Sequence, residues 1–523
     1  MPFAASLSNR SDSPSVDARL VNGYLEKGED KSLYAYRRPG VVTQSTVAGG
    51  AAGRGVYNWL GDIYSIFTGN FYKNGAFIGA VNNDGTIYSF SPVLGATPRL
   101  FFKNKSAAYN YDGAGGLVAI STVATLVFNG TTAINSPIIT AIASTANLTA
   151  NAGVTGTGIP AGAFILSVDS GTQITINVNA TASATVSLTF VTIGFQPSTV
   201  PGLAYLDGTM YVMDAKAKIW GSNINDTTTA GWDPLTFLVA QIEPDGGVCL
   251  AKQLVYVVAF KQWSTEFFYD AAQPAGSPLG TVQGNKVNQG CRAAATVCSL
   301  EGTLLWISTT REGNVGVYLI EAARASPIGT PSVEKLLQTA DFTTSWSFAL
   351  HISGHKFYVV TVKNANLTLV FDLTTNEWYR WTDTNGNYFP FVASTFNVTQ
   401  QVLLQHESNG KLYLMKPTQF TDDGASIPWD LYTPNWDGGQ RLNKCLTRMD
   451  FIGDQVPGCI LQVRVSDSDY TKWSNFRRVD MGKQRPNLRD CGSFRRRAWH
   501  FHNVTPTFLR IQFVELHVMP GTN

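Results

Sequence analysis

A short pattern recurs along this chain, in which a turn that contains glycine precedes a β-rich run with an aromatic residue. It occurs at residues 84–88, 207–211, 301–306, 353–358 and 409–413, and without the glycine at 254–258. The aromatic residues at positions 211, 256, 306, 358 and 413 are 45, 50, 52 and 55 positions apart. The first interval, from 88 to 211, is 123, or 59 once a 64-residue insertion is left out.

Six hairpin units at this spacing predict a six-bladed β-propeller. One four-stranded sheet cannot bury both of its faces alone, so repeated sheets pack against one another. A stack of unrelated hairpins in a large sandwich is the alternative, and the even spacing favours the propeller.

The composition favours strands over helices throughout the chain. Charged residues make up 15% of the sequence and aromatic residues 12%, and 48 of the 523 residues are glycine. Such a composition is typical of strands joined by turns, so we expect an all-β protein of roughly two to four domains. Residues 333–338 are the best candidate for a short helix. No run of 18 apolar residues occurs, so we expect no membrane insertion, and the residues from Met1 onward do not resemble a secretory signal.

The central part of the chain is almost free of charge. Between Asp112 and Asp207 the one charged residue is Asp169. Short apolar runs alternate here with segments that carry glycine, proline and asparagine, a pattern typical of strands and turns. Residues 129–192 are therefore predicted to form a small β-sandwich inserted into a larger domain. A low-complexity linker is the alternative.

After about residue 431 the chain becomes basic. From Arg441 to Arg510 there are 14 lysine and arginine residues and 6 acidic residues, a net charge of +8 that leaves −6 for the rest. Alternating runs at 461–465, 498–502 and 509–514 predict strands. The expected domains are an N-terminal arm with strands of the platform (1–55), the first part of the propeller (56–128), the inserted module (129–192), the remainder of the propeller (193–430) and a basic C-terminal β platform (431–523).

The sequence contains no recognisable catalytic motif. The nucleophile elbow, the phosphate loop, the zinc-protease helix and the dinucleotide-binding glycine pattern are all missing from it. The six cysteines form no C-x-x-C pair, so reduced thiols in packed strands are expected. His500 and His502 are interpreted as two surface histidines at a sheet edge in preference to a metal site, and residues 383–387 as a turn in preference to a calcium loop. We expect no enzymatic activity, no catalytic residue, no cofactor and no metal.

The arginines of the C-terminal segment are the remaining candidate site. They lie among aromatic residues, as arginines do in protein interfaces and on phosphate-binding surfaces. We favour a protein interface, then protection of a sheet edge, then nucleic-acid binding, because no other basic domain would help to bind a polyanion.

Seven short stretches share their order and spacing with a known family. They are residues 34–40, 243–247, 266–270, 289–293, 304–308 and 371–378, and the pattern that runs from Ser466 through Trp473 to Arg497. Together they resemble the tail-hub, or nozzle, proteins of short-tailed bacteriophages, also called packaged-DNA stabilisation proteins. The resemblance covers about residues 20–125 and 195–518. The insertion falls outside it and resembles the small Ig-like modules of phage structural proteins.

The resemblance implies a virion protein of the phage tail that assembles in the cytoplasm of the host bacterium. Such proteins form a homohexameric ring below the portal and its adaptor, carry tail fibres, spikes or needles, and retain and conduct double-stranded DNA without sequence specificity. We expect the N-terminal region and the basic C-terminal domain to form a head-proximal platform. The predicted interface residues are Arg37, Arg38, Arg477, Arg478, Arg495, Arg496, Arg497 and Trp499.

The alternative function is a carbohydrate-binding or hydrolysing propeller of a phage tailspike or secreted enzyme. In that case Trp220, Trp263, Trp306, Trp378 and Trp381 would stack on sugars. Packing of buried aromatic residues between blades is the simpler explanation for them.

Overall fold

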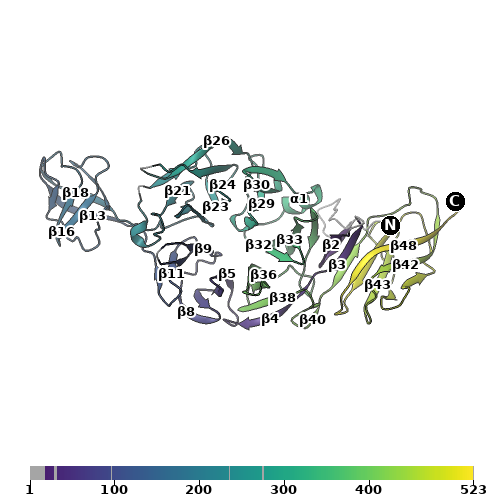
Figure 1. Ribbon diagram of the computed structural model, residues 1–523. Helices are drawn as coiled ribbons and strands as arrows, with labels where there is room; N and C mark the ends of the chain where they lie inside the picture. Colours follow the sequence, from purple (N-terminus) through teal and green to yellow (C-terminus); the bar gives the residue numbers. More distant parts are fainter. Residues whose placement is uncertain (1–17, 29–31, 96, 235, 274–275, 522–523) are drawn as a thin grey trace. The chain divides into compact units, whose positions relative to one another are not determined.

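The computed structural model describes residues 18–521 except 29–31, 96, 235 and 274–275, and consists mainly of strands (Figure 1). The chain divides into two compact units, one of residues 1–77 and 295–523 and the other of residues 78–294. The part of the predicted N-terminal arm that covers residues 1–17 lies outside the described residues. Within the described ranges, no helix has the length and apolar character that a membrane crossing requires.

The repeated element of the fold is a four-stranded antiparallel sheet whose strands follow one another in the chain. Four such groups of strands lie largely in the first unit; two form separate four-stranded sheets, one belongs to a five-stranded sheet and one to a nine-stranded sheet. Their strands are β5 (Gly53–Trp59), β6 (Asp62–Phe67), β7 (Asn70–Lys73) and β8 (Ala76–Ala80); β28 (Cys298–Leu300), β29 (Thr303–Thr309), β30 (Val315–Glu321) and β31 (Arg324–Pro327); β32 (Ser345–Ile352), β33 (His355–Val362), β34 (Leu367–Asp372) and β35 (Glu377–Arg380); and β36 (Phe391–Phe396), β37 (Val402–His406) and β38 (Lys411–Lys416) with β4 (Gly40–Thr46).

The second unit contains three sheets of the same kind. Their strands are β9 (Ser89–Val93), β10 (Arg99–Lys103), β11 (Ala108–Tyr111) and β12 (Leu117–Ala119); β19 (Ala204–Leu206), β20 (Thr209–Met213), β21 (Lys218–Gly221) and β22 (Phe237–Val239); and β23 (Gly247–Gln253), β24 (Tyr256–Lys261), β25 (Thr265–Asp270) and β26 (Leu279–Val287). The described residues therefore hold seven sheets of this kind, one more than the six predicted, because the sheet β5–β8 was not expected.

The predicted turns do not all occupy the same place in a sheet. The turns at 207–208, 254–255, 301–302 and 353–354 each join the first strand of a sheet to the second. The turn at 84–85 instead precedes β9, and the turn at 409–410 joins β37 to β38. The predicted turn thus joins the first two strands of a sheet in four units and lies at another place in the other two.

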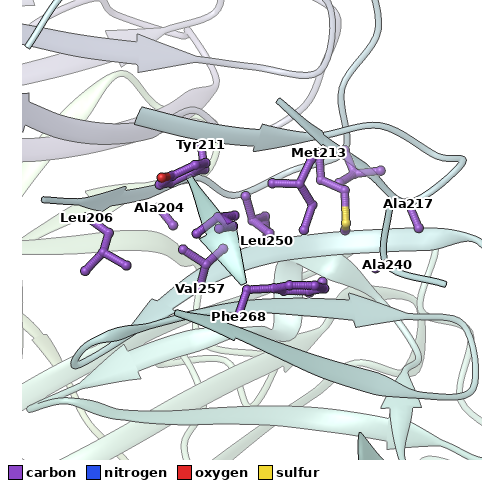
Figure 2. Packing of buried hydrophobic residues seen from close by; sticks show 13 residues of the cluster. Ala204, Leu206, Tyr211, Met213, Ala217, Ala240, Leu250, Val257 and Phe268 are labelled. Carbon is purple, nitrogen blue, oxygen red and sulfur yellow. The ribbon is translucent and has the colours of Figure 1, made fainter. Parts of the chain in front are cut away.

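Neighbouring sheets bury their apolar faces against each other. In the second unit, Tyr211 of β20 and Leu250, Val257 and Phe268 of the next sheet belong to one cluster and are inaccessible to solvent (Figure 2). Removing a large apolar side chain from water contributes about 1.5–3 kcal/mol. Blade-to-blade packing of this kind supplies the stability that a single sheet lacks.

The short helix lies where the sequence predicts it. Helix α1 (Pro331–Gln338) begins after Thr330, whose hydroxyl accepts a hydrogen bond from the backbone N–H of Val333, and a proline occupies its first position. Both features are typical of helix starts. Its buried face consists of Val333, Leu336 and Leu337. The remaining short elements are β27 (Gly290–Cys291) and the 3-10 turns η1 (Thr229–Gly231), η2 (Ala294–Thr296) and η3 (Lys363–Ala365).

The insertion is a separate β module with its own apolar core. Its strands form one antiparallel sheet in the order β15-β18-β13-β14-β17-β16. Backbone hydrogen bonds also join Val154 to Ala163 and Ile165 to Ala152, so the two ends of the sheet meet. The expected two-sheet, Ig-like sandwich is therefore wrong, because the six strands close into a small barrel. The strands are β13 (Thr125–Thr132), β14 (Ile138–Thr140), β15 (Gly153–Gly156), β16 (Ile165–Ser170), β17 (Gln173–Ile176) and β18 (Ala184–Val191).

The C-terminal part of the first unit consists of two sheets that combine N-terminal and C-terminal strands. One follows the order β1-β41-β47-β43-β44 and continues from β35 of a four-stranded sheet. The other follows the order β2-β3-β48-β42-β45, with β46 also paired to β42. We call these two sheets the platform. Its strands are β1 (Arg19–Val21), β2 (Gly23–Lys27), β3 (Leu33–Arg37), β41 (Trp429–Tyr432), β42 (Lys444–Gly453), β43 (Ile460–Ser466), β44 (Arg477–Asp480), β45 (Asn487–Arg489), β46 (Ser493–Phe494), β47 (Ala498–Asn503) and β48 (Arg510–Pro520).

Strand β4 lies in the range expected for the platform, but it pairs elsewhere. It is antiparallel to β38, with Gly40 opposite Lys416 and Thr46 opposite Lys411. A short hairpin, β39 (Thr421–Asp422) and β40 (Ala425–Ser426), follows β38. An N-terminal strand thus completes the sheet formed by β36–β38.

Candidate interaction surface on the platform

Two edge strands of the platform carry a group of exposed cationic side chains. β44 is the last strand of one platform sheet and β45 the last strand of the other. We call this region the platform edge. Its exposed cationic residues are Arg477, Arg478, Lys483, Arg485, Arg489, Arg495 and Arg496.

One of these arginines connects the two edge strands. The guanidinium of Arg477 donates hydrogen bonds to the backbone carbonyls of Asp490 at 3.0 Å and Arg489 at 2.5 Å. Arg496 lies 3.7 Å from Asp469, and both side chains are about half exposed. A pair of this kind contributes little in water, so the charge of Arg496 stays available to a partner.

A mostly apolar hollow of about 360 Å³ lies beside Arg477. Its wall includes Met449, Val463, Leu488 and Cys491. Burial raises the pKa of the Cys491 thiol, so this cysteine behaves as a small apolar residue. An apolar hollow with arginines at its rim has the composition of a protein-binding surface.

Four of the eight predicted interface residues do not reach this surface. Arg37, Arg38, Arg497 and Trp499 are at most 3% exposed. Their prediction as contacts to a partner is wrong, because their side chains lie inside the chain. Arg477, Arg478, Arg495 and Arg496 are exposed and are brought to the platform edge.

The buried arginines stabilise the platform from within. Arg37 donates hydrogen bonds to the backbone carbonyls of Ile427 at 2.7 Å and Asn503 at 2.9 Å. Arg497 binds both carboxylate oxygens of Asp467, at 2.7 and 2.8 Å, and lies over the Phe494 ring. Two-point contacts of this type hold a side chain in one geometry.

His500 and His502 meet at a carboxylate that the sequence analysis did not connect with them. His500 Nε2 and His502 Nδ1 lie 2.6 and 2.7 Å from the same Oδ1 atom of Asp430. Arg464 Nε donates to His500 Nδ1 at 2.7 Å, so the ring carries its proton on Nε2 and donates it to Asp430. His500 is 2% exposed and lies on the inner strand β47, so the expectation of a surface histidine at an edge is wrong for it.

This cluster is an internal hydrogen-bond network, because both ring nitrogens of His500 are occupied by protein groups. Burial lowers the pKa of His500 to about 4. Burial alone would raise the pKa of Asp430, but the hydrogen bonds from the two histidines bring it below its usual range. A neutral histidine beside an ionised aspartate is thus the state of this site at neutral pH.

We expect acid to destabilise the platform between about pH 6.5 and pH 4. His500 is neutral in the folded protein down to about pH 4, whereas an unfolded histidine takes up a proton near pH 6.5. The unfolded state therefore binds more protons in this window. As the pH is lowered from about 6.5 to 4, the free energy of unfolding decreases by roughly 3 kcal/mol in all. The loss of Asp430 ionisation adds to this effect at still lower pH. Thermal unfolding of His500→Gln should lose most of this slope, and His517→Gln, at an exposed position, should keep it; equal slopes in both would contradict the assignment.

The residues proposed for sugar stacking are mostly inaccessible. Trp220, Trp306, Trp378 and Trp381 are all at most 7% exposed. Trp263 is 38% exposed. Four of the five tryptophans therefore cannot stack on a sugar, and the alternative function loses the observation on which it rested.

The loop at residues 383–387 is a turn, as the sequence analysis favours. Asp383 Oδ1 accepts hydrogen bonds from the backbone N–H groups of Asn385 and Asn387 at 2.9 and 2.7 Å. The carboxylate is thus used within the loop, as in an Asx turn.

Three residues that were not predicted, Asp430, Arg19 and Arg380, line a second hollow of the first unit. In the short strand β41, buried Trp429 and Leu431 alternate with the less buried Asp430 and Tyr432, so the pattern places Asp430 on the face opposite to the buried residues. Arg380 follows directly on the buried residues Trp378 and Tyr379.

One family model matches part of the chain. Residues 160–417 match the family model described as "Bacteriophage P22 Gp10, beta-propeller". The match begins inside the insertion, which the sequence resemblance had left out. No curated protein matches the chain.

Several solved structures match the chain at low sequence identity and low TM-score. The computationally designed Ika8 protein is 12% identical, with 72% of this chain and 99% of that chain covered and a TM-score of 0.33. BamB from Moraxella catarrhalis is 9% identical, with 73% and 97% covered and a TM-score of 0.35. The extracellular domain of the one-component system BT4673 from B. thetaiotaomicron is 8% identical, with 93% and 62% covered and a TM-score of 0.39.

The four-stranded sheets and the family match agree on an all-β protein with a propeller. The family consists of phage structural proteins, which is consistent with the expectation of no enzymatic activity. Residues 160–417, just under half of the chain, match the phage stabilisation family, the family of the Bacteriophage P22 Gp10 β-propeller.

Proposed function

We propose that this protein is the tail hub, or nozzle, of a short-tailed phage. In this proposal its subunits form a homohexameric ring below the portal and its adaptor. The ring retains the packaged DNA, conducts it during ejection without reading its sequence, and carries fibres, spikes or a needle. The family supports the coarser role of a phage structural protein in the virion.

The observation that carries the proposal is the platform edge. Its cationic residues and its apolar hollow lie where two sheets end in strands β44 and β45. Edge strands with exposed backbone groups are completed or covered when subunits assemble. An acidic surface of the adaptor or of a neighbouring subunit would complement the arginines.

We expect Arg495→Glu/Arg496→Glu to prevent the joining of tails to filled heads. Reversing a charge at an interface leaves a repelling pair, and disrupted charge pairs at interfaces typically cost about 2–5 kcal/mol. The purified variant should unfold within about 0.5 kcal/mol of the wild type, because both side chains are exposed. Electron microscopy and infectivity of particles made with the variant measure the effect. Arg324→Glu, an exposed arginine of β31, is the matched control.

Normal tails on the double-variant particles would contradict the role of the platform edge. The ring itself is tested separately, from the particle mass and negative-stain images of the wild-type protein alone and with the portal-adaptor complex. Six-fold rings with a central channel support the hub. A subunit that stays monomeric in both conditions contradicts it. A subunit that needs the adaptor as a template still counts as a hub, since a head-to-tail contact that does not close gives open fibres.

A further inference from the structure

A cavity of about 380 Å³ lies in the first unit where a four-stranded sheet continues into the platform. Strand β1 makes this connection. It is parallel to β35, with Val21 opposite Arg380, and antiparallel to β41, with Arg19 opposite Tyr432. The wall includes Arg19, Arg380, Asp430 and Tyr432 from these strands.

The two arginines of the cavity lie near each other in a partly desolvated place. Arg19 is 7% exposed, and its guanidinium carbon lies 3.6 Å from the centre of the Tyr432 ring. Burial lowers the pKa of Arg380, and the nearby positive charge of Arg19 lowers it further. Burial also lowers the pKa of Arg19, while Tyr432 and Asp430 act in the opposite direction.

Arg380 has few protein partners. Its Nε is inaccessible to solvent and has no hydrogen-bond acceptor. Its Nη2 lies 3.4 Å from the backbone carbonyl of Asn366, at the outer limit of a hydrogen bond. A partly buried guanidinium beside a second cation is costly unless an anion compensates it.

The carboxylate in the wall, Asp430, favours the positive charge of Arg19 but is not among the groups that act on Arg380. Asp430 accepts hydrogen bonds from His500 and His502 on one oxygen. With His500 neutral, Arg19, Arg380 and Asp430 leave the cavity with a net positive charge.

The mouth of the cavity adds neutral donors. Thr384 and Asn385 belong to the turn that Asp383 fixes through its carboxylate. Among the described residues, no hydrogen bond involves the Thr384 hydroxyl or the Asn385 side-chain amide. These groups can therefore donate to a ligand in the cavity.

We propose that this cavity binds a small oxyanion, a carboxylate or a phosphate group, between Arg380 and the turn at Thr384 and Asn385. Arginine presents paired N–H groups that match the oxygens of both anions. The volume is at the lower end of the range for small-molecule sites, so it suits one small anion or an acidic side chain. The site is distinct from the platform edge and does not depend on the hub function.

The test is calorimetric titration of the full chain with inorganic phosphate and, separately, with acetate, at constant ionic strength. We expect saturable binding of at least one of them and a rise of the melting temperature with its concentration. Arg380→Gln should weaken this binding by about ten- to a hundredfold, as the loss of a charge-assisted hydrogen bond does. Arg324→Gln, an exposed arginine on β31, should leave it unchanged.

A second variant guards against an effect of folding. Asn385 is exposed in the turn, so Asn385→Ala should fold normally and still weaken binding severalfold. The absence of binding to the wild type, or equal binding by Arg380→Gln, would overturn the proposal. Binding of a short DNA duplex but of neither small anion would also overturn it and assign the arginines to nucleic acid.

Discussion

Replacing Arg38 with methionine is expected to destabilise the first unit by about 3–5 kcal/mol, the usual cost of removing one partner of a buried ion pair. Arg38 is inaccessible to solvent, and its guanidinium binds both carboxylate oxygens of Asp422, at 3.0 and 2.5 Å. It also donates to Asn22 Oδ1 at 3.0 Å and to the backbone carbonyl of Thr382 at 3.0 Å. The variant leaves these four acceptor atoms without this donor. Chemical unfolding measures the loss.

The ion pair can be separated from the loss of packing. Asp422→Asn alone should also destabilise the protein, and Arg38→Met/Asp422→Asn should cost less than the sum of the two single changes. Arg495→Met, at an exposed position, should change the stability by no more than about 0.5 kcal/mol. Additive effects of the two single changes would show that the pair contributes nothing beyond its separate contacts.

Replacing Lys261 with methionine is expected to destabilise the second unit by a similar amount, about 3–5 kcal/mol. Lys261 Nζ lies 2.8 Å from Asp245 Oδ1 and 2.5 Å from Glu266 Oε1, and all three side chains are inaccessible to solvent. It also donates to the carbonyl of Glu243 at 2.7 Å. The variant leaves two buried carboxylates without their cation. Unfolding followed by hydrogen exchange in β24 and β25 localises the effect.

The control for Lys261 is a neighbouring pair that is only partly buried. Lys286 lies 2.6 Å from Glu243, and both side chains are about a quarter to a third exposed, so Lys286→Met should cost less than about 1 kcal/mol. Equal losses for the two lysines would contradict the importance of burial. Lys261 connects two of the stretches by which the sequence resembles its family, residues 243–247 and 266–270, so their resemblance has a structural basis.

The repeated turns could be predicted from the sequence because they have a backbone requirement. At 207–208, 301–302 and 353–354 both central residues have positive φ, which glycine adopts at little cost in the second position. The same geometry occurs at Leu60 and Gly61, with φ of 54° and 89°, between β5 and β6. This turn was missed because an apolar leucine stands where a polar residue is usual, and because Tyr64 and Tyr88 are closer together than the expected repeat.

The buried arginines show where alternation was informative and where it failed. In β3, Ala35 and Arg37 are both buried and two residues apart, so the period of a strand already placed Arg37 on the inner face. In β47, an inner strand between β41 and β43, every side chain but that of His502 is buried. The period of two carries no information there. Arg495, Arg496 and Arg497 precede this strand, outside any alternating pattern, so only the structure separates buried Arg497 from exposed Arg495 and Arg496.

The pairing of β4 with β38 has a consequence for how the protein is made. Gly40 leaves the ribosome early in synthesis, but its partner Lys416 is added only when most of the chain is complete. Contacts so distant in sequence form late and slow the folding of a domain. In a chain whose translation stops before β38, strand β4 therefore has no partner strand. Its unpaired backbone groups then leave the chain open to aggregation or proteolysis. The pairing of one N-terminal strand thus requires synthesis of the chain as far as β38.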